Sequence, residues 1–189
     1  MRGVHIIKRG MRGGIAARYA AGVLMLALAA CTRPARAADP APVSEYHTLE
    51  WELFQHVSLH RDSLNLARLR FDEDLAALAR EHSRAMASGA VPFSHERFEE
   101  RAAQAVALGY PFLGENLAFN DYAADTTARV ALAGLVGSPP HRHTMEGDWE
   151  RSGVGVARSA DGRWFYTQLF ARGAPKPRPL HPPRSPVPP

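Results

Sequence analysis

Cysteine is nearly absent from this chain of 189 residues, and Cys31 is the only one. No disulfide can therefore form within the chain, and the fold must depend on its apolar core. A long apolar run is also missing: the run at residues 19–30 holds twelve residues, whereas a membrane-spanning helix needs about 20. Hydrophobic residues still make up 46% of the chain, which is enough for one ordinary domain.

Acidic residues are absent from both ends. Residues 1–38 contain seven basic residues and residues 171–189 contain four, without a single Asp or Glu. The chain has a formal charge of +4, but residues 39–170 are acidic. They hold twelve basic residues and all nineteen acidic ones, a net charge of −7. An acidic domain does not favour a phosphate backbone, so we expect no nucleic-acid partner.

The N-terminus has the order of an export signal. A basic stretch at residues 1–18 precedes the apolar run, whose twelve residues have the length of a signal-peptide core. We therefore predict a signal peptide over residues 1–30 and an exported protein.

The predicted signal ends in Leu28-Ala29-Ala30-Cys31, which resembles a bacterial lipobox. The resemblance implies that Cys31 is lipidated and that residues 31–42 form a lipid-anchored linker to the membrane. Thr32 rather than aspartate follows the cysteine, which by the same resemblance favours the outer membrane. Cleavage at Ala35-Arg36-Ala37 is the alternative, and it predicts a periplasmic or secreted protein without an anchor.

Proline is concentrated at the other end, where residues 171–189 hold eight of the fifteen. Proline removes an amide donor and favours the extended polyproline II conformation. We therefore predict that residues 172–189 form a disordered basic tail outside the domain.

Helical patterns come first in the middle of the chain. Apolar residues recur at helical spacing over residues 44–60, 96–108 and 125–136, and in a further segment that Asp72 can cap and Gly89 can stop. In the helix at residues 96–108, the residues expected to be buried are Phe98, Ala102, Ala105 and Val106.

Strand-forming patterns dominate the end. Residues 116–119, 153–157 and 163–170 are β-prone, and the turn residues at 159–162 predict a hairpin between the last two. Residues 61–70 are expected to be a connector. Helices first and strands last predict an α+β domain rather than alternating β-α units.

Polar groups capable of chemistry lie at three predicted turns. His95 follows the second helix, Glu115 and Asn116 lie at the start of the first strand, and His141 follows the fourth helix. Two imidazoles and one carboxylate suit a divalent metal or acid–base catalysis. Nothing in the spacing forces these residues together, so ordinary surface histidines are the alternative from the residues alone.

Six short motifs occur in an order and spacing that resemble the CAP superfamily (cysteine-rich secretory proteins, antigen 5, pathogenesis-related proteins), in its cysteine-poor bacterial SCP-domain form. The motifs are Ala79-Arg80-Glu81-His82-Ser83 with Met86, Phe93-Ser94-His95, Gly114-Glu115-Asn116-Leu117, Ser138-Pro139-Pro140-His141-Arg142, Gly153-Val154-Gly155 and Tyr166-Thr167-Gln168-Leu169-Phe170. The resemblance covers about residues 46–171. It implies a domain over residues 43–171, folded as an α-β-α sandwich with a small central antiparallel sheet.

The resemblance also implies a site. In that family two histidines and acidic residues line a cleft, which in some members holds a divalent cation. Carried over by motif, His95 and His141 are the metal ligands, with zinc as the expected cation, and Glu115 is the carboxylate. Asn116 either belongs to the ligand-binding set or orders the turn.

Three positions depart from the family pattern. Ser138 stands where many animal members have a second glutamate. The set of two histidines and two glutamates that lines the cleft in those members is therefore incomplete here. Pro140 replaces a usual glycine and Leu135 a common tryptophan. These departures alter the expected shape of the cleft rather than the fold.

Other polar residues have simpler explanations. His82 lies in an apolar helical stripe and is expected to be a satisfied packing residue. On a helix, His143 points roughly 200° away from His141, so only one of the two can face the cleft. Glu115 can equally be a structural acceptor for loop amides.

We therefore predict an exported or lipid-anchored bacterial envelope protein with one CAP domain, which binds a small molecule, a lipid or a divalent cation. A metal-assisted hydrolase with Glu115 as the base is the alternative. A purely structural module is the third possibility. A serine hydrolase is disfavoured, because Ser94 and Ser138 lie near histidines only in sequence, and a triad is defined by geometry.

Overall fold

The helices and strands follow the predicted order in a computed structural model, which describes residues 43–175. The elements are α1 (Val43–Ser63), β1 (Arg70–Phe71), α2 (Glu73–Ala87), α3 (Phe98–Leu108), β2 (Phe112–Asn120), α4 (Ala124–Gly137), α5 (Pro139–Met145), β3 (Arg151–Arg158) and β4 (Trp164–Arg172). Two short elements, β1 and α5, are additions to the sequence prediction. The connector predicted at residues 61–70 is shorter, because α1 continues through Ser63 and β1 begins at Arg70.

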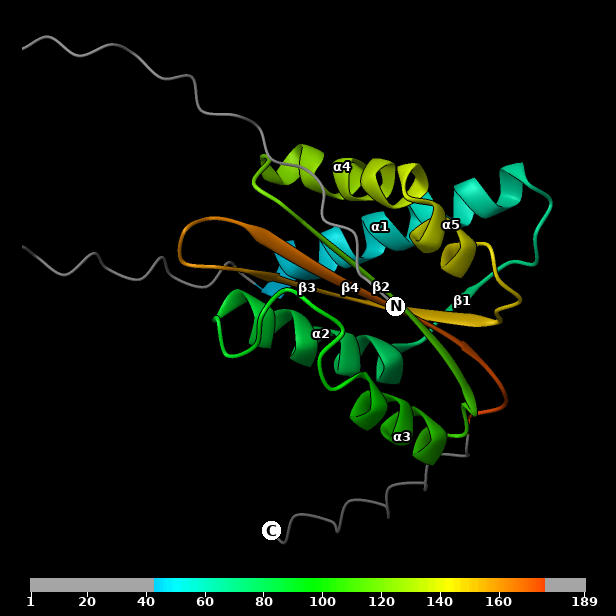
Figure 1. Cartoon of the computed structure of the whole chain (residues 1–189). Helices are drawn as coiled ribbons and strands as arrows, with labels where there is room; N and C mark the ends of the chain where they lie inside the picture. Colours follow the sequence, from blue (N-terminus) through cyan, green and yellow to red (C-terminus); the bar gives the residue numbers. More distant parts are fainter. Residues whose placement is uncertain (1–42, 176–189) are drawn as a thin grey trace, which may run out of the picture.

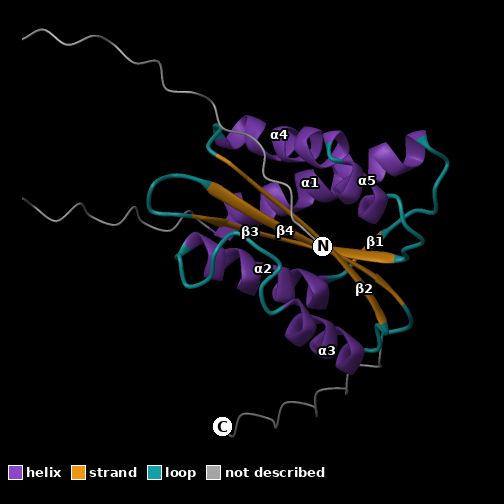
Figure 2. Ribbon diagram, viewed as in Figure 1, coloured by secondary structure: helices purple, strands orange, loops and turns teal. Residues whose placement is uncertain are grey.

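The four strands form one sheet in the order β1-β3-β4-β2 (Figure 2). β4 pairs antiparallel with both β2 and β3, as predicted for the hairpin and the central sheet. The two-residue β1 pairs parallel with β3, so the complete sheet is mixed rather than purely antiparallel. The α+β sandwich predicted from the sequence is confirmed.

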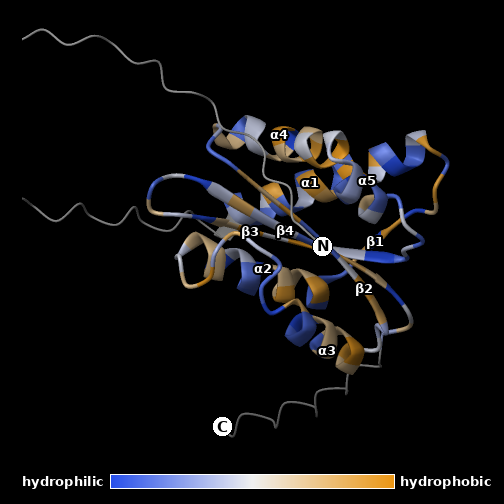
Figure 3. Cartoon of the chain, viewed as in Figure 1, coloured by the Kyte–Doolittle hydropathy of each residue, from blue (hydrophilic) through white to orange (hydrophobic). Residues whose placement is uncertain are grey.

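Helices cover both faces of the sheet, with α1, α4 and α5 on one side and α2 and α3 on the other (Figure 1). β4 shows the consequence, because successive side chains of a strand point to opposite faces. Trp164, Tyr166 and Phe170 pack into the core beneath α1 and α4, whereas Phe165 and Leu169 pack on the side of α2. Figure 3 shows polar colours at the turn between β3 and β4 and alternating polar and apolar segments along the helices.

α2 lies directly against β3, and both its start and its contact follow from local sequence. Asp72 caps the helix, because its carboxylate accepts a hydrogen bond from the amide of Leu75. A Cβ atom on Gly153 or Gly155 would lie within 2.2 Å of the α2 backbone, so only glycine permits this close approach. The Gly-Val-Gly motif is thus a packing feature.

The burial pattern of α3 differs from the prediction. Ala105 is buried as expected, but Val106 is 52% exposed, and Phe98 and Ala102 are only partly buried. The position on the buried stripe is taken instead by Arg101. The guanidinium can lie there because a buried carboxylate, Glu115, compensates its charge.

The predicted processing and anchoring segments lie outside the described residues. They are the signal peptide at residues 1–30, the linker at residues 31–42 with Cys31, and the tail beyond residue 175. β4 includes Arg172, the first residue of the predicted tail. Among residues 43–175, no helix is long and apolar enough to cross a membrane.

Candidate functional site

The predicted site residues are distributed around β2, an edge strand of the sheet. Glu115 and Asn116 are consecutive on this strand, so their side chains point to opposite faces. Glu115 contacts His95 and Arg101 on the side of α3. Asn116 instead contacts α5, where its amide nitrogen donates to the carbonyl oxygen of His141 at 2.9 Å. The strand therefore connects the segments that carry the two histidines.

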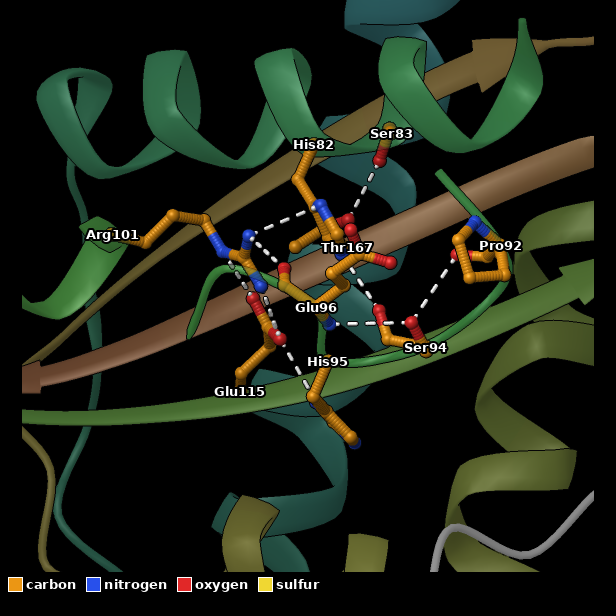
Figure 4. A network of polar contacts seen from close by, with 9 residues as sticks. All are labelled: His82, Ser83, Pro92, Ser94, His95, Glu96, Arg101, Glu115 and Thr167. Carbon is orange, nitrogen blue, oxygen red and sulfur yellow. Dashed lines mark hydrogen bonds and ion pairs between the residues drawn. The ribbon is translucent and has the colours of Figure 1, made fainter. Parts of the chain in front are cut away.

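Glu115 is a buried carboxylate held by three charge-assisted hydrogen bonds (Figure 4). Nε and Nη2 of Arg101 donate to its two oxygens at 2.7 and 2.8 Å, and Nδ1 of His95 donates to Oε1 at 2.8 Å. Burial alone would raise the pKa of Glu115, but the hydrogen bonds from His95 and Arg101 outweigh it and lower the pKa. The group is therefore ionised at neutral pH and can only accept hydrogen bonds.

The ionised carboxylate determines the tautomer of His95. Nδ1 must carry a proton to donate to Glu115, so in the neutral ring Nε2 keeps its lone pair. The side chain is 46% exposed, and Nε2 has no hydrogen-bond partner among residues 43–175. His95 thus presents an oriented nitrogen that can bind a cation.

His141 is the second imidazole of the predicted pair and lies on α5, half-buried. Burial lowers its pKa, and the charge on His95 lowers it further. The two rings are therefore close enough for their charges to interact. A lowered pKa keeps His141 neutral at pH 7, so it too offers a nitrogen lone pair.

His82 is a buried, hydrogen-bonded residue, as predicted. Its Nε2 donates to the carbonyl oxygen of Ser94 at 3.0 Å, while its Nδ1 faces Nη1 of Arg101 at 3.1 Å and accepts from it. Burial and then the charge of Arg101 lower the pKa of His82, which keeps the ring neutral. The contact with Ser94 secures the loop next to His95.

Arg101 is the residue of the site that sequence reasoning missed. Besides Glu115 and His82, it contacts the loop before α3, where Nη1 donates to the carbonyl oxygen of Glu96 at 2.9 Å. A signal was available: Arg101 lies three residues after Phe98 and four before Ala105, on the apolar stripe of α3. An arginine in such a stripe indicates a buried acidic partner.

The donors suited to a metal are limited to two nitrogens. Both oxygens of Glu115 are engaged by Arg101 and His95, so this carboxylate lies behind the imidazole rather than beside a bound ion. Among residues 43–175, no group of three or more His, Cys, Asp or Glu side chains is arranged to hold a metal ion. The nitrogens left for a ligand near this network are Nε2 of His95 and a ring nitrogen of His141.

The junction of β2 and α5 carries two unsatisfied polar atoms. Oδ1 of Asn116 and Oγ of Ser138 are buried and have no hydrogen-bond partner within residues 43–175. Ser138 precedes α5 without capping it through its side chain. The amide nitrogen of Asn116 holds the backbone of His141, and its place in the ligand-binding set stays a prediction.

Solved structures share this fold. An outer surface protein from Borrelia burgdorferi aligns with a TM-score of 0.57 at 16% identity, over 67% of this chain and 94% of that one. An extracellular SCP-domain protein from Bacillus anthracis aligns with a TM-score of 0.55 at 27% identity, over 67% and 41%. A cysteine-rich secretory protein from Staphylococcus aureus aligns with a TM-score of 0.56 at 18% identity, over 69% and 40%.

The chain therefore spans about two fifths of the length of the Bacillus and Staphylococcus proteins. Among curated protein sequences, none matches it significantly. The model of the cysteine-rich secretory protein family, CAP, matches residues 54–170, more than half of the chain. That segment contains β2, the polar network and both site histidines, and the chain belongs to the CAP family.

Proposed function

We propose that this CAP protein is an exported binding protein of the bacterial envelope, and that it binds its ligand between His95 and His141. The observation that carries the site is the 2.8 Å hydrogen bond from Nδ1 of His95 to Glu115, a carboxylate that Arg101 holds in turn. This hydrogen bond fixes Nδ1 of the imidazole and directs Nε2 outward, as a carboxylate does when it accepts from the other ring nitrogen of a metal-binding histidine.

A divalent cation such as zinc is the ligand whose chemistry suits the pair best. Neutral imidazole nitrogens bind zinc at about 2.0–2.1 Å, and a site with few protein ligands leaves positions for water or a second molecule. When bound, such an ion would polarise whatever occupies those positions. Two nitrogen donors support only weak binding, which protons oppose as the histidines become charged.

A hydrolase using the same residues is the second candidate. The pairing of His95 with Glu115 matches the base-and-orienter part of a catalytic triad. Glu115 itself is unsuited to act as the base, because its side chain is 1% exposed and both of its oxygens are engaged. The geometry supports Nε2 of His95 in that role instead.

Export rests on the sequence of the N-terminus and on the structural relatives. The Borrelia relative is described as an outer surface protein and the Bacillus relative as extracellular. A lipid attached to Cys31 would place the domain at a membrane, with the outer membrane favoured. A small molecule or a lipid remains the partner of the site when no cation takes part.

Calorimetric titration of the purified protein with zinc tests the proposal. Wild-type protein should bind zinc weakly near pH 7.5, whereas His95→Ala and His141→Ala should each abolish this binding. His143→Ala is the matched control, because this residue lies on the same helix as His141 and is exposed. Retention of zinc binding in both site variants would overturn the cation proposal.

Peptide and ester hydrolysis distinguishes the two candidates. Hydrolysis of a peptide or ester that is lost in His95→Ala and kept in His143→Ala would favour the hydrolase. Zinc binding without turnover would favour the binding protein.

A further inference from the structure

Another region with room for a ligand is the end of the sheet where β1, β2 and β3 begin and β4 ends, to the right in Figure 1. The described residues there enclose a groove of about 720 Å³. That volume falls in the range of small-molecule sites, about 300–1,000 Å³. Its lining residues differ from those of the His95 network, so the groove is argued independently of the proposed function.

Arginine dominates the charge of this groove. Four arginines line it against two acidic residues: Arg68, Arg70, Arg151, Arg172, Asp148 and Glu150. The excess of two positive charges contrasts with the acidic middle of the chain, which carries a net charge of −7. Positive charge is thus gathered at one place on an otherwise acidic domain.

Two of the four arginines are fixed by acidic partners. Arg172 pairs with Asp148 at 2.6 Å and lies over the ring of Phe112, with its Cζ atom 4.4 Å from the centroid. Arg151 pairs with Asp72 at 3.1 Å. The carboxylate of Asp72 is buried and also caps α2, so Arg151 is held on a rigid support.

The other two arginines remain uncompensated. Arg68 has only a long contact of 3.5 Å with Asp62, and with its side chain 87% exposed this contact contributes little. Arg70 is exposed and has no acidic partner among residues 43–175. With Arg172 paired to Asp148 and Arg151 paired to Asp72, the charges left in the groove are Arg68, Arg70 and Glu150, a net of one positive charge.

Strand register places the free arginine beside a fixed one. Arg70 of β1 is the direct partner of Arg151 on β3, so both side chains leave the same face of the sheet. Like charges directly opposite one another on a sheet destabilise it. An oxyanion between the two guanidinium groups would remove that repulsion and accept hydrogen bonds from both.

We infer that this groove binds a phosphate monoester, with the phosphate between Arg70 and Arg151. The charge left in the groove is positive, and arginine forks fit phosphate oxygens in pairs. The volume exceeds that of a bare phosphate group, so an attached organic part has room. A soluble phosphate ester and the headgroup of a phosphomonoester lipid both present this chemistry.

Titration of the purified full-length protein with glycerol phosphate at low salt is the test. Wild-type protein should bind, and Arg70→Gln should weaken binding about tenfold or more, the share of one charge-assisted contact. Arg70→Lys, which keeps the charge without the fork, should fall between the two. Arg129→Gln is the control, because Arg129 is exposed on α4 and away from the groove.

Sedimentation with vesicles separates the two sources of the phosphate. Vesicles of phosphatidylcholine with phosphatidic acid, compared with phosphatidylcholine alone, present the same monoester on a lipid. Loss of vesicle binding in Arg70→Gln but not in Arg129→Gln, without binding of glycerol phosphate, would identify the lipid as the source. The inference would be overturned if Arg70→Gln and Arg129→Gln bound equally well in both assays, or if wild-type protein bound in neither. Thermal melting verifies that every variant is folded.

Discussion

Arg101→Met removes the guanidinium that holds Glu115, and most of the apolar stem of the side chain remains. The lost contacts are two hydrogen bonds to the carboxylate at 2.7 and 2.8 Å, one to the carbonyl of Glu96 at 2.9 Å and one to Nδ1 of His82 at 3.1 Å. Only the hydrogen bond from His95 would still compensate the charge of Glu115. The substitution therefore tests whether this ion pair is the structural basis of the site.

The expected cost is large because solvent cannot replace the lost partner. The side chains of Arg101 and Glu115 are 8% and 1% exposed. Removing one partner from a buried pair costs about 3–5 kcal/mol, since an uncompensated charge stays buried. We expect the lower end, about 3 kcal/mol, because His95 remains as a donor.

Urea unfolding at pH 7 measures this cost. With a denaturant slope of about 1–3 kcal/mol/M, the midpoint should fall by about 1–3 M. Arg129→Met, on an exposed position of α4, is the matched control and should stay within about 0.5 kcal/mol of wild type. A loss below about 1 kcal/mol for Arg101→Met, the range of a surface ion pair, would refute the reasoning.

A double variant isolates the pair from the rest of the network. Arg101→Met with Glu115→Met removes both charges, so it should be less destabilised than the sum of the single variants. Additive costs would mean that the two side chains stabilise the fold independently and that the carboxylate does not depend on Arg101.

Three further outcomes are expected. Phe165→Ala, which empties a buried position on the α2 side of β4, should lower the free energy of unfolding by about 3–5 kcal/mol in urea, and a change below about 1 kcal/mol would contradict the two-faced core. Burial and Arg101 lower the pKa of His82, so as the pH falls the unfolded chain binds a proton at this residue before the folded chain does. The free energy of unfolding should therefore decrease as the pH drops below about 6.5. His82→Gln should weaken this dependence of the unfolding free energy on pH, measured by urea unfolding at several pH values. Cys31→Ser should move the protein from the membrane fraction to the soluble fraction of cells, whereas wild-type protein that is already soluble would exclude the lipid anchor.

The close-up of the network explains why a residue can be necessary at the site without contacting a ligand. Arg101 is shielded, yet it orients Glu115, and Glu115 orients His95 (Figure 4). Substitution of Arg101 should therefore change zinc binding through His95 rather than through a lost ligand.

Periodicity and turn residues in the sequence were sufficient for the order of the elements. The cap at Asp72 and the hairpin around residues 159–162 were predicted because they depend on neighbours within a few residues. The helix α5 was missed, since Pro139-Pro140 reads locally as a stop, although proline is tolerated in the first turn of a helix. The strand β1 was missed because two residues carry no periodic pattern.

The sequence by itself determined the α+β class and the six family motifs, and it predicted His95, Glu115 and His141 as site residues. Only the tertiary structure decided how they are used, because strand pairing and helix packing bring distant residues together. It aligned Arg101 with Glu115, turned Asn116 to the opposite face and placed Arg70 beside Arg151. Each of these outcomes depends on register and on buried charge compensation, which are properties of pairs of segments and leave no mark within either segment alone.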